Sequence, residues 1–140
     1  MYLVGSRAFF EGYADFNPKD KDFLILDENP KRYKIFRQTS LNGKCLFEWK
    51  KFSPNKFIEI HKNNGTGMLI GKFLVPEVCK DIGFTIEHLK KLEPLLEKLD
   101  DKHKYESVIF YAYLENGDFV LTQKQRDEAY RVYKEARNGN

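Results

Sequence analysis

Two stretches, YLVGS at residues 2–6 and KDKDFLIL at residues 19–26, decide the fold predicted for this chain. The apolar residues of each stretch predict a β-strand, and Gly5-Ser6 ends the first strand in a turn. Side chains of a strand alternate between its faces, so Asp20 and Asp22 are expected on the same face, roughly 6.6 Å apart along the backbone. Two carboxylates so close repel each other unless cations lie between them. The pattern therefore predicts a cation site on the second strand.

The residue types around this predicted cation site indicate chemistry at phosphorus. Two divalent ions about 3.5 to 4 Å apart are the usual arrangement for in-line displacement at a phosphate. Mg²⁺ suits the site because it prefers oxygen ligands and needs only one or two protein carboxylates, with substrate phosphates and waters completing its shell. Gly5 allows the backbone to approach a phosphate, and Ser6 offers N–H groups and a hydroxyl to the anion.

The order of these features resembles the DNA polymerase beta-like nucleotidyltransferase superfamily. Its signature is an apolar strand, Gly-Ser, a gap, and Asp-x-Asp opening a second apolar strand. GSRA at 5–8 and DKDFLI at 20–25 are the matching residues, and the resemblance covers roughly the first 60 residues. The middle residue of Asp-x-Asp, usually apolar in the superfamily, is Lys21 here. The resemblance implies a metal-dependent nucleotidyltransferase that moves a nucleoside monophosphate from an NTP to an acceptor hydroxyl and releases pyrophosphate.

The same resemblance implies the catalytic and metal-binding residues. Asp20 and Asp22 would hold two Mg²⁺ ions, or Mn²⁺ in their place. A third carboxylate belongs on a strand beside the Asp-x-Asp strand, between apolar neighbours. Both Glu59 and Glu48 meet that description, and Glu59 is the preferred candidate because two β-branched residues flank it. Glu59 would bind the catalytic metal and take the proton of the attacking hydroxyl as a general base.

The nucleotide-binding residues implied by the resemblance are Gly5, Ser6 and Arg7, which would contact the phosphates, and Lys72, which would contact the triphosphate after a glycine-rich linker at 63–67. The acceptor remains open among a protein, an RNA and a small molecule.

Further turn signals extend the predicted sheet. Asn42-Gly43 lies between the β-type runs 33–38 and 44–52, and Asn-Gly in that position is the strongest short-range signal for a hairpin. After a break at Ser53-Pro54, the run 56–61 resumes as one more strand. The front of the chain is therefore expected to form a mixed or antiparallel sheet.

The second half of the chain shows mainly helical spacing. Pro76 is expected in the first turn of a short helix, Thr85 caps a second helix that Pro94 interrupts, and Thr122 opens the last one. Residues 105–112 fit a helix face, but the β-rich run into Asn116-Gly117 also fits a second hairpin. The hairpin is the preferred prediction.

Together these patterns predict an α+β fold in a single domain, 1–140. Residues 1–62 would form a nucleotidyltransferase-like sheet core, and residues 68–140 would form a largely helical part packed on it. A length of 140 residues suits one domain with a sizeable core. The aromatic fraction of 15% is high and is typical of core residues.

Composition limits the partners and the cellular compartment expected for the protein. The net charge of +3 is too small to indicate a nucleic-acid surface by itself. Cys45 and Cys79 lack metal-type spacing and are interpreted as reduced, buried thiols. No run approaches the ~20 apolar residues of a membrane span, and no secretory leader is recognised, so a cytoplasmic protein without a membrane partner is expected.

Two alternatives to the enzyme remain open. The first is a catalytically inactive module that binds a nucleotide or a partner protein. The second is an RNA-binding protein that uses basic pairs such as Lys50-Lys51 and Lys90-Lys91, which predicts a steep loss of affinity with salt.

Overall fold

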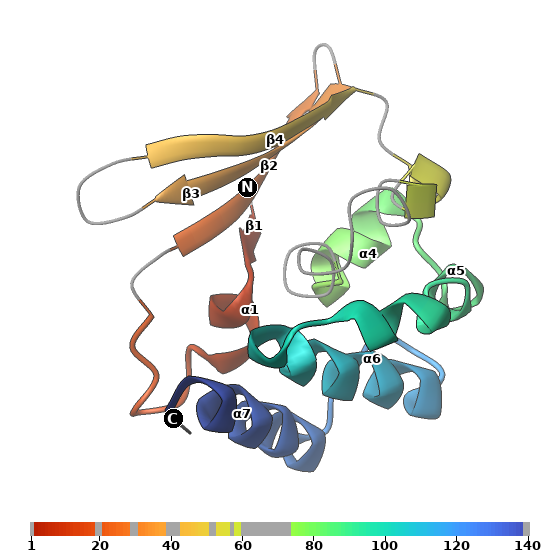
Figure 1. The fold of residues 1–140 in the computed structure, drawn as a ribbon. Coiled ribbons are helices and arrows are strands. Elements are labelled where there is room, and N and C mark those ends of the chain that lie inside the picture. The colour runs from red at the N-terminus through yellow and green to blue at the C-terminus, as the bar shows by residue number, and fades with distance from the viewer. Residues whose placement is uncertain are drawn as a thin grey trace.

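The fold was obtained as a computed structural model, which describes residues 2–18, 21–28, 31–38, 43–50, 53–56, 58–59 and 74–138. Among these residues, four strands lie on one side of the molecule and the two longest helices on the other (Figure 1). The first helix lies between these two parts and contacts both the first strand and the last helix.

The four strands form one antiparallel sheet in the order β1-β2-β3-β4. Their bounds are β1 Tyr2–Val4, β2 Lys21–Glu28, β3 Lys31–Gln38 and β4 Gly43–Lys50. Each strand pairs with the next one along the chain, with one irregularity between Ile35 and Phe36 where β3 meets β4. The hairpin predicted around Asn42-Gly43 is confirmed, because Gln38 pairs with Gly43.

The first helix, α1 (Ser6–Phe10), follows β1 directly, and the other helices come from the second half of the chain. These are α4 Pro76–Ile82, α5 Ile86–Lys90, the 3-10 helices η1 Glu93–Lys98 and η2 Asp101–His103, α6 Lys104–Asn116 and α7 Gln123–Asn138.

Several helix ends lie where the sequence predicts them. Pro76 occupies the first turn of α4, and Thr85 forms a capping box with His88 at the start of α5. The chain passes from α5 into η1 at Pro94, as two consecutive helices rather than one. The hydroxyl of Thr122 accepts a hydrogen bond from the backbone N–H of Gln125 (3.1 Å) at the start of α7.

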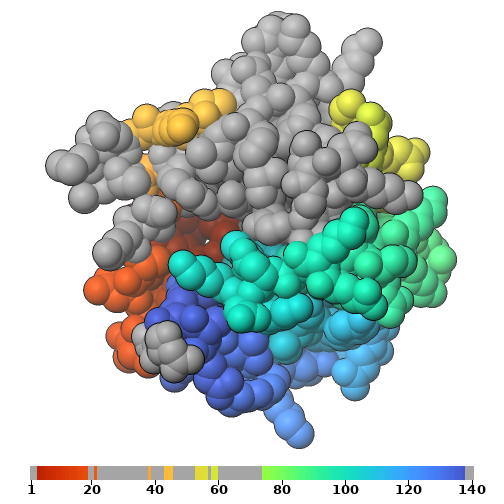
Figure 2. Space-filling view, in the orientation of Figure 1, coloured from red at the N-terminus to blue at the C-terminus, as the bar shows by residue number. Residues whose placement is uncertain are grey.

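The hydrophobic core described by the structure is centred on the helices. Phe10 of α1 is fully buried, and its ring lies within 5.4 Å, centroid to centroid, of Tyr105, Tyr130 and Tyr133. Helices α6 and α7 pack against each other, and α7 also contacts α1 (Figure 1). In the space-filling view, the blue atoms of α7 lie against the red atoms of the N-terminal residues (Figure 2). Among residues of known burial, Val4 is the strand residue that joins this core.

The predicted fold class is therefore wrong and must be corrected. The chain is not built on an N-terminal, nucleotidyltransferase-like sheet core, because the described core is formed by helices, mostly from the second half of the chain. The sheet is a simple antiparallel succession of neighbours rather than a mixed sheet.

The second hairpin is also absent from this region, because residues 104–116 form helix α6. Asn116-Gly117 ends that helix: Gly117 has a φ of 69°, and a glycine in this left-handed conformation is a common helix C-terminus. The same dipeptide serves a hairpin turn, so local sequence alone did not separate the two outcomes.

The strand expected at 56–61 is helical wherever the structure describes it, at residues 54–56 and 58–59. The hydroxyl of Ser53 accepts a hydrogen bond from the backbone N–H of Lys56 (3.2 Å), and Pro54 lies at the start of the helical segment. Ser-Pro, interpreted as a chain break, is instead a helix start, because serine caps a helix and proline suits its first turn.

Candidate functional site

The Gly5-Ser6 turn connects β1 to α1 with a backbone conformation that favours glycine. Gly5 is buried and has φ 78° and ψ −161°, a region of backbone space that side chains essentially exclude. Its carbonyl accepts a hydrogen bond from the N–H of Ala8 (3.1 Å), which closes the first turn of α1. The turn is thus built on a residue that cannot readily be replaced.

The register of the sheet brings one aspartate of the Asp-x-Asp segment beside this turn. Asp22 pairs with Val4, the residue that immediately precedes Gly5. On its other side Asp22 pairs with Arg37 of β3. The backbone of Asp22 therefore lies between the buried Val4 and Arg37. Asp20 lies outside the described residues.

The guanidinium of Arg7 contacts the protein's own backbone and a neighbouring carboxylate. Its guanidinium donates a hydrogen bond to the carbonyl oxygen of Pro18 (3.0 Å) and forms an ion pair with Glu11 at 3.6 Å. Pro18 ends the described loop that leads towards Asp20 and β2. Arg7 therefore fixes the approach of the chain to the Asp-x-Asp segment.

The two candidates for the third carboxylate do not lie on a strand beside β2. Glu59 is exposed in the helical segment, where it forms an ion pair with Lys56 at 3.6 Å. Glu48 lies on β4, with β3 between it and β2. The strands that do flank β2, residues 2–4 and 31–38, contain neither aspartate nor glutamate. Lys72 lies outside the described residues.

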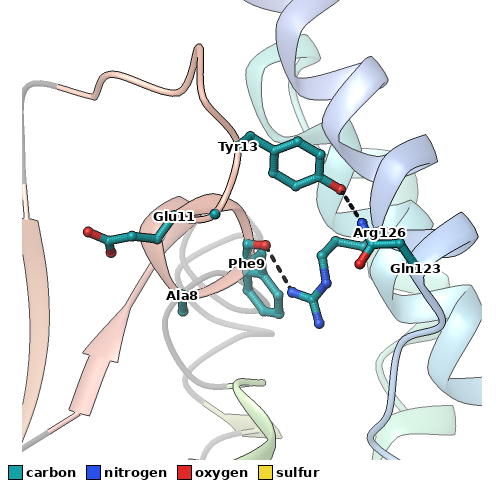
Figure 3. Close-up of a pocket in the computed structure, with 7 residues that line it drawn as sticks. Ala8, Phe9, Glu11, Tyr13, Gln123 and Arg126 are labelled. Carbon is teal, nitrogen blue, oxygen red and sulfur yellow. Dashed lines mark hydrogen bonds between the residues drawn. The ribbon is translucent and has the colours of Figure 1, made fainter.

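A cavity of about 380 Å³ opens at the other end of α1, against the first turns of α7 (Figure 3). It is lined by Ala8, Phe9, Glu11, Gly12, Tyr13, Gln123 and Arg126. The guanidinium of Arg126 donates a hydrogen bond to the carbonyl oxygen of Phe9 (2.9 Å), and the Gln123 amide donates one to the hydroxyl of Tyr13 (3.2 Å). Sequence patterns did not indicate this cavity, because its two walls are more than 100 positions apart.

Beside the cavity, Tyr13 is joined to Asp127 by a hydrogen bond of 2.5 Å that the tyrosine hydroxyl donates. Burial and the neighbouring carboxylate raise the pKa of Tyr13 to about 12. The same hydrogen bond, together with one from Gln123, lowers the pKa of Asp127. The pair is therefore a neutral phenol and a carboxylate over a wide range of pH.

A tyrosine of α7 makes the reverse connection, to an aspartate of the loop after α1. The hydroxyl of Tyr130 donates a hydrogen bond of 2.6 Å to Asp15, which lowers the pKa of that carboxyl. The rings of Tyr13 and Tyr130 stack at 4.0 Å between centroids. The loop after α1 is thereby attached to α7 at two neighbouring points.

The two cysteines have different environments. Cys79 is buried in the core as predicted, and burial raises the pKa of its thiol well above the usual range, which keeps it unreactive. Cys45 is exposed on β4, so its prediction as a buried residue is wrong. Glu106 of α6, 2% exposed, is the buried charged residue of the described core, and no sequence pattern had singled it out.

Within the described ranges, no group of three or more histidine, cysteine, aspartate or glutamate side chains lies close enough to hold a metal ion. No helix in this part of the chain is long and apolar enough to cross a membrane.

Comparison with known proteins gave no match to a family model, to a curated protein or to a solved structure.

Proposed function

We propose that this protein is a nucleotidyltransferase that moves a nucleoside monophosphate from an NTP to an acceptor hydroxyl, with release of pyrophosphate. The proposed reaction site lies where β1 ends and β2 begins. Gly5-Ser6 would contact the phosphates, and Asp20 and Asp22 would hold Mg²⁺. The bound metal would supply positive charge to the phosphates and to the leaving pyrophosphate.

The observation that supports this proposal is the pairing of Val4 with Asp22. It brings the backbone of the Gly-Ser turn and that of Asp22 together at one end of two neighbouring strands. Carboxylate oxygens are the ligands that Mg²⁺ prefers, and a glycine turn at a helix start is a common place for a phosphate. Arg7 would act as a positioning residue, because its hydrogen bond to Pro18 holds the chain that enters β2.

A second candidate function is a module that binds a nucleotide or a partner protein without transferring a group. The observation that favours it is the placement of Glu59 in a helical segment and of Glu48 two strands away from β2. With neither carboxylate beside Asp22, the general base of the transfer reaction has no assigned residue. Nucleotide binding through Gly5-Ser6 and the aspartates does not need that base.

The two functions differ in whether pyrophosphate is released. The experiment measures pyrophosphate release from ATP and GTP with Mg²⁺, together with calorimetric binding of the same nucleotides. For the enzyme, Asp22→Asn should reduce release by at least about 100-fold, the scale expected when a group that stabilises transition-state charge is lost. Asp27→Asn, on the same strand five positions further along, is the matched control and should leave release unchanged.

Three results separate the possibilities. Release that depends on Asp22 and not on Asp27 supports the transferase. Metal-dependent nucleotide binding without release supports the binding module. Absence of both release and nucleotide affinity in the wild-type protein would contradict the transferase and the nucleotide-binding module, and would leave a module that binds a partner protein. The acceptor, whether a protein, an RNA or a small molecule, and the proposed cytoplasmic setting would follow from labelling with an NTP in a cell extract.

A further inference from the structure

The cavity between α1 and α7 is separate from the proposed transfer site, because neither Gly5, Ser6 nor Asp22 lines it. Its volume of about 380 Å³ lies within the range of roughly 300–1,000 Å³ that is typical of small-molecule sites. Its walls come from two elements that the core holds together through Phe10 and Tyr130. A cavity with such walls is preformed.

Arg126 supplies the positive charge of this cavity. Its side chain is half-buried, and the hydrogen bond from its Nη1 to the Phe9 carbonyl (2.9 Å) fixes the orientation of the guanidinium. A guanidinium carries five N–H donors, so this bond leaves donors for another group. Within the part of the chain that the structure describes, Arg126 makes no ion pair with a carboxylate. A partly buried cation of this kind attracts an anion.

Two nearby carboxylates have other hydrogen-bond or ion-pair partners, although the charge of Arg126 also helps to lower the pKa of Asp127. Asp127 accepts hydrogen bonds from Tyr13 and Gln123. Glu11 forms its ion pair with Arg7, and in Figure 3 its side chain points away from Arg126. The face of the cavity beside Arg126 therefore keeps a positive character.

Besides Arg126, the cavity offers both apolar contacts and polar ones, the latter from Glu11, Gln123 and the hydroxyl of Tyr13. The ring of Tyr13 forms one wall, and Ala8 and Phe9 form the opposite side of the opening in Figure 3. At Gly12 a side chain would meet no heavy atom within 4 Å, so open space lies beside this residue. This combination suits a ligand with one charged end and one flat or apolar end.

We propose that the cavity binds a small organic anion, with its carboxylate or phosphate on Arg126 and its apolar part against Tyr13. Arg126 forms a forked donor that matches the paired oxygens of either anion. The proposal does not depend on nucleotidyl transfer, because the cavity shares no residue with the Gly5-Ser6 turn or with Asp22.

The experiment titrates the full-length protein with two probes, benzoate and phenyl phosphate, and follows binding by NMR chemical shifts and calorimetry. The two probes share an aromatic ring and differ in the anion, so they distinguish a carboxylate ligand from a phosphate ester. Arg126→Gln removes the charge, and Lys124→Gln is its matched control, since Lys124 is exposed on the same turn of α7 and does not line the cavity.

A second pair of variants tests the cavity without touching Arg126. Gly12→Leu should fill the open space, and Ala14→Leu adds the same side chain at an exposed position outside the lining. This pair keeps the test decisive if Arg126→Gln fails to fold, which thermal unfolding would reveal.

The proposal expects saturable binding of at least one probe to the wild-type protein. Affinity should fall by at least about tenfold in Arg126→Gln, because one charge-assisted contact is lost. It should fall by a similar factor in Gly12→Leu, because the leucine side chain takes the space of the ligand. It should stay within about twofold in both control variants. No saturable binding of either probe, or equal affinity in Gly12→Leu and the wild type, would overturn the proposal.

Discussion

The two ends of α1 illustrate two different ways of building a site. At its N-terminal end, Gly5, Ser6 and Asp22 come from segments within about twenty positions of one another, and one strand pairing brings them together. At its C-terminal end, the cavity combines residues 8–13 with Gln123 and Arg126. The first arrangement follows a local pattern that sequence can show, whereas the second exists only because α7 packs against α1. The predictions below test how independent these two ends are.

The largest effect is expected for Phe10→Ala, because Phe10, the last residue of α1, is completely buried at the centre of the aromatic core. Removing a buried phenylalanine should lower the free energy of unfolding by about 3–5 kcal/mol. Chemical denaturation would measure this loss. Tyr111→Ala, on the 48% exposed side chain of Tyr111, is the control and should cost far less. Similar losses in both variants would contradict the central position of Phe10.

The next effect compares the two glycines at opposite ends of α1. Gly5→Val should destabilise the protein by about 1–3 kcal/mol, because φ 78° and ψ −161° are unfavourable for any side chain. Gly12→Ala should be neutral or slightly stabilising, since a Cβ at Gly12 meets no neighbour and the unfolded chain loses entropy. Denaturation midpoints of both variants provide the measurement. A stable Gly5→Val protein would show that the turn tolerates another conformation.

A smaller effect is expected for Arg7→Gln, which removes the hydrogen bond to the Pro18 carbonyl. Loss of a hydrogen bond from a charged group should cost about 1.5–3 kcal/mol at most, and less here because glutamine can replace part of the contact. Glu11→Gln removes only the exposed ion pair and should cost about 0–1 kcal/mol. If the proposed transfer is correct, Arg7→Gln should also lower kcat more than it raises KM. A change in KM alone would argue for direct contact with the nucleotide.

The smallest effect is expected in the pH dependence of stability, through Tyr13 and Asp127 beside the cavity. The pKa of Tyr13 is raised from its ordinary 10.0 to about 12, so its contribution to stability is complete below about pH 10 and is lost as pH rises through 12. The pKa of Asp127 is lowered from 3.8, so its contribution is present above that value and is lost as pH falls below it. The thermal unfolding temperature, measured between pH 3 and 11, should therefore be constant at intermediate pH and fall at both ends of this range.

Tyr13→Phe is the test of this pH dependence. The variant lacks the phenol hydroxyl that Asp127 accepts, so the losses at both the acid and the alkaline end should become shallower. Lys124→Gln, at an exposed residue of the same helix as Asp127, provides the control variant. If stability depends on pH in Tyr13→Phe as it does in the wild type, other groups cause the losses of stability at acid and alkaline pH.

Several local features were predictable because each depends on a few neighbouring residues. The strands before Gly5 and after Lys21, the hairpin at Asn42-Gly43 and the caps at Thr85 and Thr122 all lie where their short signals indicate. Where one signal allows two structures, the local prediction was wrong. Asn116-Gly117 ends a helix rather than a hairpin, and Ser53-Pro54 begins a helix rather than breaking a strand.

The candidate site was also predictable only in part. The proximity of Gly5-Ser6 to Asp22 was expected from the order of the segments, and the register agrees with it at the level of the backbone. The third carboxylate was not predictable, because its position depends on which strand flanks β2. The cavity and Arg126 were not predictable at all, since no local pattern connects position 9 with position 126.

By itself, the amino-acid sequence determined the strands that flank the Gly5-Ser6 turn, the hairpin around Asn42-Gly43 and the helix starts at Thr85 and Thr122, because these depend on backbone preferences and on contacts within a few residues. Only the tertiary structure decided that the core of the described residues is helical and centred on Phe10, and that Arg126 reaches the carbonyl of Phe9. The physical reason is that burial of aromatic rings outweighs local preference. A ring such as Tyr105 or Tyr113 suits both a strand and a helix, and its burial against distant residues selects the helix.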